Sequence, residues 1–240
     1  MRSGRLGEEL ASRRINEPSP IPPAWLLYLT QGNVSRLAYQ EGGRASADCI
    51  RAILGEAGVP LNIETRVLDF GCGSGRILRW WQGAVSAQGC DYNPQLAGWC
   101  AANLLGIPVA RNGARPPTPY QPDSFDLLYA QSVMTHLPPE RQVAWIQEWT
   151  RIVRPGGMIL ATFHGPSHYP PAAGLSKLDR VGHFMLAPDS IGHLCAVWNT
   201  KDDVVQRVGR DLELVLYRHR GMPASDQDIF LFRVPDRVTA

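Results

Sequence analysis

A glycine-rich loop that directly follows a short apolar segment constrains this sequence more than any other feature. Residues 65–70, Thr-Arg-Val-Leu-Asp-Phe, predict a buried strand, and residues 71–75, Gly-Cys-Gly-Ser-Gly, follow at once. Glycines here let the backbone approach a ligand closely, because a Cβ would occupy that space. A second strand is expected to end at Asp91, 20 residues beyond Gly71, where a carboxylate can accept hydrogen bonds from both ribose hydroxyls. Together these elements predict a nucleoside-binding site.

The rest of the chain predicts alternating strands and helices. Strands are expected at residues 107–111, 125–132, 158–163, 212–219 and 229–234, and helices at residues 25–29, 44–54, 76–82, 95–104, 139–152 and 202–209. Residues 154–157 predict a turn, and residues 165–198 an irregular region. This alternation predicts an α/β fold with a Rossmann-like, doubly wound, mostly parallel sheet. The last two strands, which no helix joins, predict its antiparallel end.

The domain organisation expected from these patterns is simple. Residues 1–23 form a flexible N-terminal leader that ends in a proline-rich run, and residues 24–240 form a single domain. Within that domain, residues 24–60 are expected to form a helical lid, and residues 165–200 an insertion that covers the substrate.

Charge and cysteine content narrow the classes of partner. The chain carries 24 Lys+Arg against 22 Asp+Glu, a net charge of +2, which argues against a dedicated nucleic-acid or membrane-surface protein. No stretch approaches the ~20 apolar residues of a membrane span, and no signal peptide is visible. The five cysteines lack CxxC spacing, which indicates reduced thiols in a cytoplasmic protein.

The spacing of the glycines distinguishes between nucleoside cofactors. A dinucleotide fingerprint reads G-x-G-x-x-G and presents amides to a pyrophosphate, whereas this loop reads G-x-G-x-G, with Asp69 two residues before the first glycine. A carboxylate would repel a pyrophosphate but attract the ammonium of a methionine moiety. The loop therefore favours S-adenosylmethionine over NAD.

Several stretches in this order resemble the motifs of class I S-adenosylmethionine-dependent methyltransferases. They are the glycine motif at residues 67–76, the acidic second-strand motif at 89–94, the start of the fourth strand at 123–128, and the turn into the fifth strand at 154–160. Residues 132–138, Ser-Val-Met-Thr-His-Leu-Pro, resemble the bacterial small-molecule and sugar methyltransferase branch. The resemblance covers about Thr65 to Gly165, and it implies a seven-stranded sheet whose final strand is antiparallel.

The resemblance also implies roles for individual residues. Asp69, Gly71 and Gly73 would line the methionine part of the cofactor. Cys72 lies between these glycines in the loop, and its side chain is expected to pack within the protein. Asp91 would hold the ribose and Tyr92 would pack on adenine. The family often has an acidic residue after the third strand, and Asn112, followed by Gly113, stands there instead; its amide oxygen can accept from the adenine amine. Gln131 and Ser132 would lie near the methyl-bearing sulfur.

Methyl transfer to a hydroxyl needs a base, and two histidines follow strand ends. His136 follows the fourth strand and His164 ends the fifth; a histidine near its ordinary pKa can remove a proton at neutral pH. A structural alternative is that His136 orients the start of the following helix. His168, His183 and His193 lie in the expected substrate cover. Metal-dependent relatives place acidic ligands where this chain has Gln131 and Ser132, so we expect no metal.

The predicted function is transfer of a methyl group from S-adenosylmethionine, leaving S-adenosylhomocysteine, to a small organic acceptor. The acceptor we expect is a hydroxyl of a sugar or natural product. The other expected partner is a second copy of the chain in a homodimer, and we expect no nucleic acid or membrane partner. Three alternatives stay open: N-methylation of a small molecule, a nicotinamide-dependent oxidoreductase, and a cofactor-binding protein without catalysis.

Overall fold

The computed structural model describes residues 19–168, 178, 181–186 and 195–237. Contacts divide the chain into two compact units, Met1–Asn112 and Gly113–Ala240. Most of the expected leader, part of the expected substrate-covering insertion and His193 lie outside the described residues.

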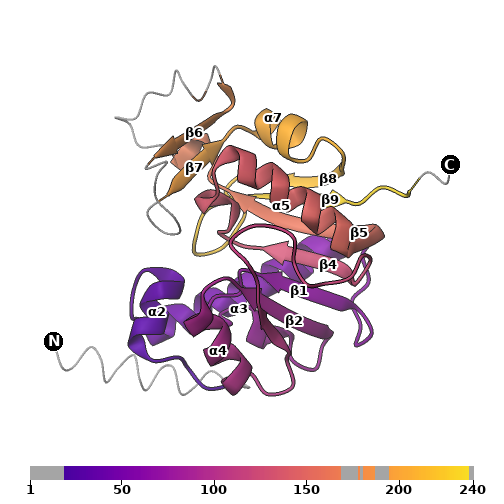
Figure 1. Cartoon of the computed structure of the whole chain (residues 1–240). Helices are drawn as coiled ribbons and strands as arrows, with labels where there is room; N and C mark the ends of the chain where they lie inside the picture. Colours follow the sequence, from indigo (N-terminus) through magenta and orange to yellow (C-terminus); the bar gives the residue numbers. More distant parts are fainter. Residues whose placement is uncertain (1–18, 169–177, 179–180, 187–194, 238–240) are drawn as a thin grey trace. The chain divides into compact units, whose positions relative to one another are not determined.

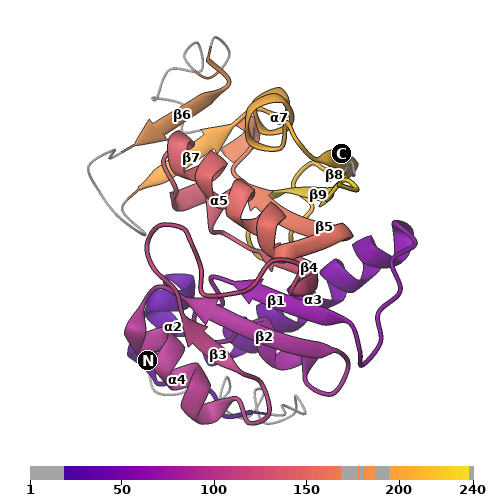
Figure 2. The same ribbon diagram turned by 45° about the vertical axis from the view of Figure 1, so that its right-hand side comes forward.

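The first unit consists of helices and a parallel set of three strands in the order β3-β2-β1. Its elements are α2 (Ala24–Gln31), α3 (Arg36–Glu56), β1 (Arg66–Phe70), the 3₁₀-helix η1 (Leu78–Trp81), β2 (Ser86–Asp91), α4 (Pro94–Asn103) and β3 (Val109–Arg111). Figure 2 shows α4 beside β2 and β3. Ser35 and Asn93 start α3 and α4, because each side chain accepts a hydrogen bond from a backbone N–H of the first turn.

A buried arginine connects several segments of the first unit. The Arg79 side chain is fully buried, and its guanidinium donates to the carbonyl oxygens of Gly75, Ser19 and Pro20 and to the Tyr39 hydroxyl. Tyr39 in turn donates to the carbonyl oxygen of Ser74, at 2.8 Å. The glycine loop, α3 and the segment before α2 therefore share one hydrogen-bond network.

The second unit carries the remaining strands of the sheet, in the order β4-β5-β9-β8. Its elements are β4 (Phe125–Ala130), the 3₁₀-helix η2 (Met134–His136), α5 (Pro139–Ile152), β5 (Val153–Phe163), η3 (Pro166–His168), β6 (His183–Leu186), β7 (Ala196–Asn199), α7 (Lys201–Asp203), the π-helical turn η6 (Val204–Val208), β8 (Glu213–Arg218) and β9 (Asp228–Arg233). Strands β4 and β5 are parallel, and β9 is antiparallel to both β5 and β8. Strands β6 and β7 pair separately (Figure 1).

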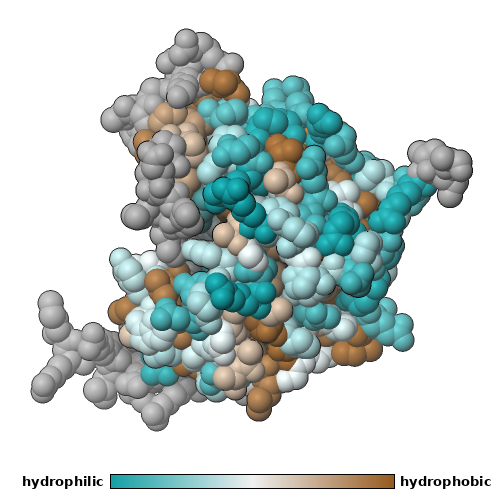
Figure 3. Space-filling view, viewed as in Figure 1, coloured by the Kyte–Doolittle hydropathy of each residue, from teal (hydrophilic) through white to brown (hydrophobic). Residues whose placement is uncertain are grey.

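Helix α5 covers the sheet of the second unit with an apolar face. Trp145, Ile146, Trp149 and Ile152 are buried, at the spacing of one helix face. Figure 3 shows mainly hydrophilic side chains over the part of this unit where α5 and α7 lie in Figure 1. The sheet side of α5 therefore forms core while its other side meets solvent.

The predicted fold class is confirmed: the chain has a Rossmann-like, mostly parallel, seven-stranded sheet whose last strand is antiparallel to its neighbours. Among the described residues, no helix is long and apolar enough to cross a membrane.

Several predicted segments differ from the structure. Residues 76–82 form only the short η1 instead of a regular helix, and three of the four η1 residues, Leu78, Arg79 and Trp81, are buried. The expected turn at residues 154–157 lies within β5, where the N–H of Gly156 bonds to the carbonyl of Val234. The expected irregular region contains β6 and β7, and the helix expected at residues 202–209 is the α7–η6 segment.

Candidate functional site

The glycine loop is fastened to the end of β2. The N–H groups of Gly71 and Cys72 both donate to the carbonyl oxygen of Cys90, at 2.8 and 3.0 Å. Gly73 and Gly75 have φ values of +58° and +77°, which side chains with a Cβ adopt only at a cost. The loop conformation therefore requires glycine at these two positions.

Protein atoms occupy the space that these two glycines leave open. A Cβ on Gly73 would lie 2.9 Å from Cγ2 of Thr30 in α2, and one on Gly75 would lie 2.5 Å from Cδ1 of Leu104. Thr30 also shares a 2.8 Å hydrogen bond with the Ser74 hydroxyl. Close packing within the unit therefore explains why a side chain is excluded at Gly73 and Gly75, and the close approach of a ligand to the loop backbone stays a prediction.

Asp91 joins the loop to the end of β2. Its Oδ2 accepts from the N–H of Gly73 and its Oδ1 from the N–H of Asn93, each at 2.8 Å. The side chain is buried, and these two backbone donors, one on each carboxylate oxygen, fix its orientation. The N–H of Asn112 donates to the Asp91 carbonyl at 3.2 Å, which places the end of β3 beside the end of β2.

The other predicted cofactor residues of the first unit differ in exposure. The Tyr92 ring, next to Asp91, is 46% exposed, and burial followed by the Asp91 charge raises the pKa of its hydroxyl. Asp69 is buried. A hydrogen bond with Cys100 and then burial raise the pKa of the Cys72 thiol. Cys72 is therefore a neutral packing thiol, and only its backbone remains as a candidate ligand contact.

In the second unit, polar groups gather just beyond β4. Gln131 is only 8% exposed, and within the described residues neither its Oε1 nor its Nε2 has a hydrogen-bond partner. A buried amide without partners is costly, so both atoms suit a bound molecule. Gly113 begins this unit and is exposed.

Ser132 adopts a strained backbone conformation. Its φ is +59°, uncommon for a residue with a side chain. Its N–H donates to Thr162 Oγ1 at 2.8 Å, and its hydroxyl to Gln227 Oε1 at 3.0 Å. Strain that neighbouring contacts maintain is typical of functional sites.

His136 lies in η2 and is half-buried. Its Nδ1 lies 2.7 Å from the carbonyl oxygen of Cys195, directly before β7. A carbonyl only accepts, so Nδ1 carries the proton and Nε2 holds the lone pair of the neutral ring. In this tautomer, Nε2 is the nitrogen that can take up a proton.

His164, at the end of β5, has different surroundings. Its Nε2 lies 3.4 Å from Nε2 of Gln227, whose Oε1 accepts from Thr162 at 2.6 Å as well as from Ser132. The ring stacks on His168 with centroids 5.4 Å apart. Burial, followed by the charges of His168 and His136, lowers the pKa of His164 to about 4. At neutral pH this ring is uncharged and weakly basic.

The structure therefore brings some of the predicted residues together, in two groups. Asp91, Gly73 and Asn112 are linked in the first unit, and Ser132 and His164 are linked through Gln227 in the second. Gln227, Thr162 and the Cys195 carbonyl were not predicted, because no local motif marks a residue whose role arises from a long-range contact. His183 lies apart from both groups, bonded to Asp203. Among the described residues, no cluster of three or more His, Cys, Asp or Glu side chains could hold a metal ion.

Comparisons with known proteins concern the domain and the fold. Residues 67–157 match the family described as "Methyltransferase domain". The fold is similar to that of an S-adenosylmethionine-dependent methyltransferase from Methanosarcina mazei, with a TM-score of 0.59 at 20% identity over 77% of this chain and 98% of that chain.

Two further solved structures are similar. A TehB-like S-adenosylmethionine-dependent methyltransferase from Corynebacterium glutamicum has a TM-score of 0.56 at 16% identity over 95% of this chain and 98% of that chain. An S-adenosylmethionine-dependent methyltransferase from Clostridium acetobutylicum has a TM-score of 0.57 at 11% identity over 80% and 92%. Residues 67–157 therefore carry a methyltransferase domain, and the fold is similar to that of solved S-adenosylmethionine-dependent methyltransferases.

Proposed function

We propose that the protein transfers the methyl group of S-adenosylmethionine to a hydroxyl of a small organic molecule, with His136 as the general base. The observation that carries the assignment of the base is the 2.7 Å contact between His136 Nδ1 and the Cys195 carbonyl oxygen. Because this contact places the ring proton on Nδ1, Nε2 is the proton acceptor. A sugar or natural product is the acceptor class, which rests on the resemblance of residues 132–138.

The residues of the first unit suit an adenosine with an attached amino acid. Asp91 is a buried carboxylate at the end of β2, the residue type that accepts hydrogen bonds from ribose hydroxyls, and the half-exposed Tyr92 beside it offers an aromatic face. Asp69 would attract the ammonium group, with Gly71, Cys72 and Gly73 contributing backbone groups. Asn112 and Gly113 would lie near adenine. The partnerless amide of Gln131, with Ser132 next to it, offers a donor and an acceptor to the methionine end or to the acceptor molecule.

The bound cofactor supplies a methyl group on a positively charged sulfur, so a hydroxyl acceptor needs only alignment and loss of one proton. His136 Nε2 takes that proton, and the Cys195 carbonyl stabilises the resulting imidazolium through the Nδ1–H bond. His164 serves less well as a base, because a nitrogen with a pKa of about 4 holds a proton weakly at neutral pH. We propose that His164 contacts the acceptor as a neutral polar group.

Neutral groups dominate the second-unit cluster, which supports a neutral acceptor. Gln131, Ser132, Thr162 and Gln227 carry no charge, and the low pKa of His164 keeps its ring neutral. The net charge of +2 gives no general attraction for nucleic acid. Five free thiols are consistent with a cytoplasmic location. We also propose that the protein forms a homodimer and that its reaction requires no metal ion.

Two measurements test the proposed function. Calorimetry should detect binding of S-adenosylhomocysteine, and binding of NAD instead would overturn the cofactor assignment. Release of S-adenosylhomocysteine should then be measured with S-adenosylmethionine and matched pairs of acceptors, each an alcohol and its amine analogue. We expect turnover with alcohols that falls by about 10²-fold or more in His136→Gln; turnover with amines alone would overturn O-methylation in favour of N-methylation.

A further inference from the structure

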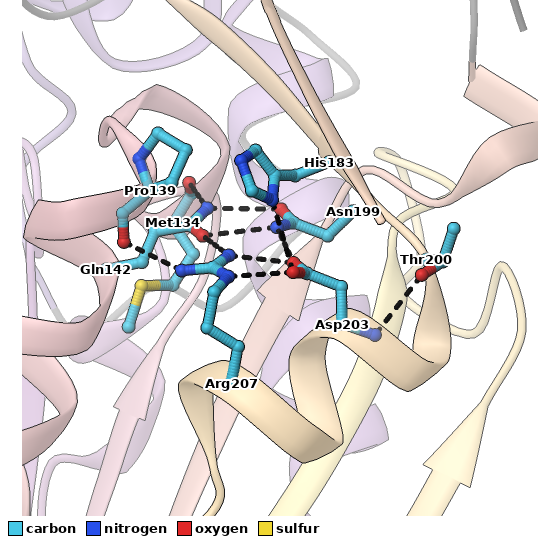
Figure 4. A network of polar contacts seen from close by, with 8 residues as sticks. All are labelled: Met134, Pro139, Gln142, His183, Asn199, Thr200, Asp203 and Arg207. Atoms are coloured by element: carbon cyan, nitrogen blue, oxygen red, sulfur yellow. Dashed lines mark hydrogen bonds and ion pairs between the residues drawn. The ribbon is translucent and has the colours of Figure 1, made fainter. Parts of the chain in front are cut away.

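A polar network at the start of α5 links the turn that carries His136 to β7 (Figure 4). Its centre is Gln142, a fully buried residue of α5. Gln142 Nε2 donates to the carbonyl oxygen of Met134 in η2, at 2.9 Å, and to Oδ1 of Asn199 in β7, at 3.1 Å. One side chain thus bonds to both η2 and β7.

The orientations of the two amides in this network are determined by their partners. Asn199 Nδ2 donates to Oε1 of Gln142 at 3.1 Å and to Oδ2 of Asp203 at 2.8 Å, while Arg207 donates to Oε1 of Gln142 at 2.9 Å. A carboxylate and a main-chain carbonyl only accept, and a guanidinium only donates. Gln142 and Asn199 therefore form a reciprocal pair that cannot flip without losing contacts.

Asp203 anchors this pair from the helical segment that follows β7. Its side chain is 5% exposed and accepts from Nε and NH2 of Arg207, each at 2.7 Å. Burial raises the pKa of Asp203, but the hydrogen bonds from Arg207 and Asn199 outweigh it, and the net pKa is lowered. The carboxylate is therefore ionised at neutral pH and bonds both Asn199 and Arg207, the two residues that contact Gln142.

The two segments that Gln142 joins are those that meet in the His136–Cys195 contact. Met134 begins the turn that ends at His136, and Cys195 directly precedes the strand that ends at Asn199. We propose that Gln142 is a positioning residue that holds η2 against β7, so that the Cys195 carbonyl keeps His136 in its Nδ1–H tautomer. The catalytic consequence rests on the proposed function, whereas the tautomer can be measured without any acceptor.

The chemistry of histidine makes this positioning consequential. A neutral histidine in water favours the Nε2–H tautomer, in which Nε2 is a donor and cannot accept a proton. If η2 and β7 shift apart, the Nδ1 contact is lost and the ring returns toward that tautomer. Gln142 would then act on the base without touching the substrate.

The test uses the ¹⁵N chemical shifts of the histidine rings in the full chain, at a pH of about 8, above the ordinary histidine pKa of about 6.5. Signals of His136 are assigned by their loss in His136→Gln. Gln142→Met keeps the side-chain length but removes every hydrogen bond, and Gln142→Glu keeps acceptors toward Arg207 but removes the donor to Met134. Glu148→Gln is the control, because Glu148 is a buried polar residue of the same helix that bonds to Thr118 and Arg151 instead.

We expect the Nδ1–H signature in the wild type and in Glu148→Gln, and a shift toward Nε2–H in both Gln142 variants. An unchanged His136 tautomer in a folded Gln142 variant would overturn the proposal. It would also be overturned if His136 carried its proton on Nε2 in the wild type, or if Glu148→Gln caused the same shift as the Gln142 variants. Circular dichroism establishes folding, and if Gln142→Met is unfolded, Gln142→Glu decides. The affinity of the wild type for S-adenosylhomocysteine is measured in parallel. Absent binding would contradict the proposed function, whereas the tautomer measurement tests the role of Gln142 independently.

Discussion

The Nδ1 atom of His136 and the carbonyl oxygen of Cys195 lie 2.7 Å apart, although 59 positions separate the two residues in the sequence. The carbonyl belongs to the main chain, so no substitution of Cys195 removes it directly. The function of His136 therefore depends on how β7 is held, and variants of His136 itself give the clearest measure of its role.

Replacing His136 with Gln should reduce turnover by about 10²-fold or more, a usual loss for a general base. Glutamine keeps a polar group of similar reach but cannot accept a proton at neutral pH. Turnover is measured with the best acceptor of the alcohol panel, and affinity for S-adenosylhomocysteine should be unchanged. Near-normal turnover would assign the base to another residue.

Replacing Asp91 with Asn should weaken S-adenosylhomocysteine binding by about 10- to 100-fold, since hydrogen bonds to a charged group contribute about 1.5–3 kcal/mol. Isothermal titration calorimetry measures the change. Asp48→Asn is the matched control, because Asp48 is an exposed acid of the same unit that pairs with Arg51. Equal affinity of the Asp91 variant and the control would refute the ribose assignment.

Replacing Gly73 with Ala should destabilise the protein by about 1–3 kcal/mol, the usual cost of a strained backbone residue, plus a clash. The clash is with Cγ2 of Thr30. Thr30→Ser removes that methyl group but keeps the hydroxyl that bonds to Ser74. In a double-mutant cycle measured by urea unfolding, Thr30→Ser should recover part of the loss; strict additivity would show that the backbone conformation alone is responsible.

His164 should make stability depend on pH. Its pKa is about 4 in the folded chain and about 6.5 when unfolded, so between these values the unfolded chain binds more protons. Stability is therefore lost as the pH falls from about 6.5 to about 4, by about 1–3 kcal/mol. Urea unfolding of wild type and His164→Gln over this range measures the effect as the difference between the two curves. A constant difference would contradict the low pKa.

The sequence predicted those parts of the fold whose signals are local. Strand β1 and the glycine loop are contiguous, and α5 carries its apolar residues at helical spacing, so pattern alone located both. Residues 76–82 were mispredicted as a regular helix. The buried Arg79 in this segment bonds to Ser19 and Tyr39, which lie far away in the sequence, so a local pattern gives no sign of these contacts. Strands β6 and β7 were missed because each has only four residues and because the sequence between them contains proline, glycine and histidine, which weaken a strand pattern.

The residues of the candidate site also fall into those that a local motif predicts and those that only long-range contacts bring in. Asp69, Asp91 and the glycines stand in a motif with fixed spacing, and the sequence alone located them. The partners of Ser132 and His164 could not be predicted, because Gln227 enters from the start of β9, 95 positions after Ser132. The tautomer of His136 depends on a main-chain carbonyl, and backbone acceptors leave no trace in residue identity.

The buried guanidinium of Arg79 has a practical consequence for anyone who shortens this protein. Two of its acceptors are the carbonyl oxygens of Ser19 and Pro20, which precede the first helix and would be removed by trimming the chain to begin at Ala24. Two other partners of this cation, Gly75 and Tyr39, belong to the glycine loop and to the helix that supports it. Residues that look dispensable in a purification scheme therefore help to hold the loop, and a protease site or affinity tag belongs before Ser19.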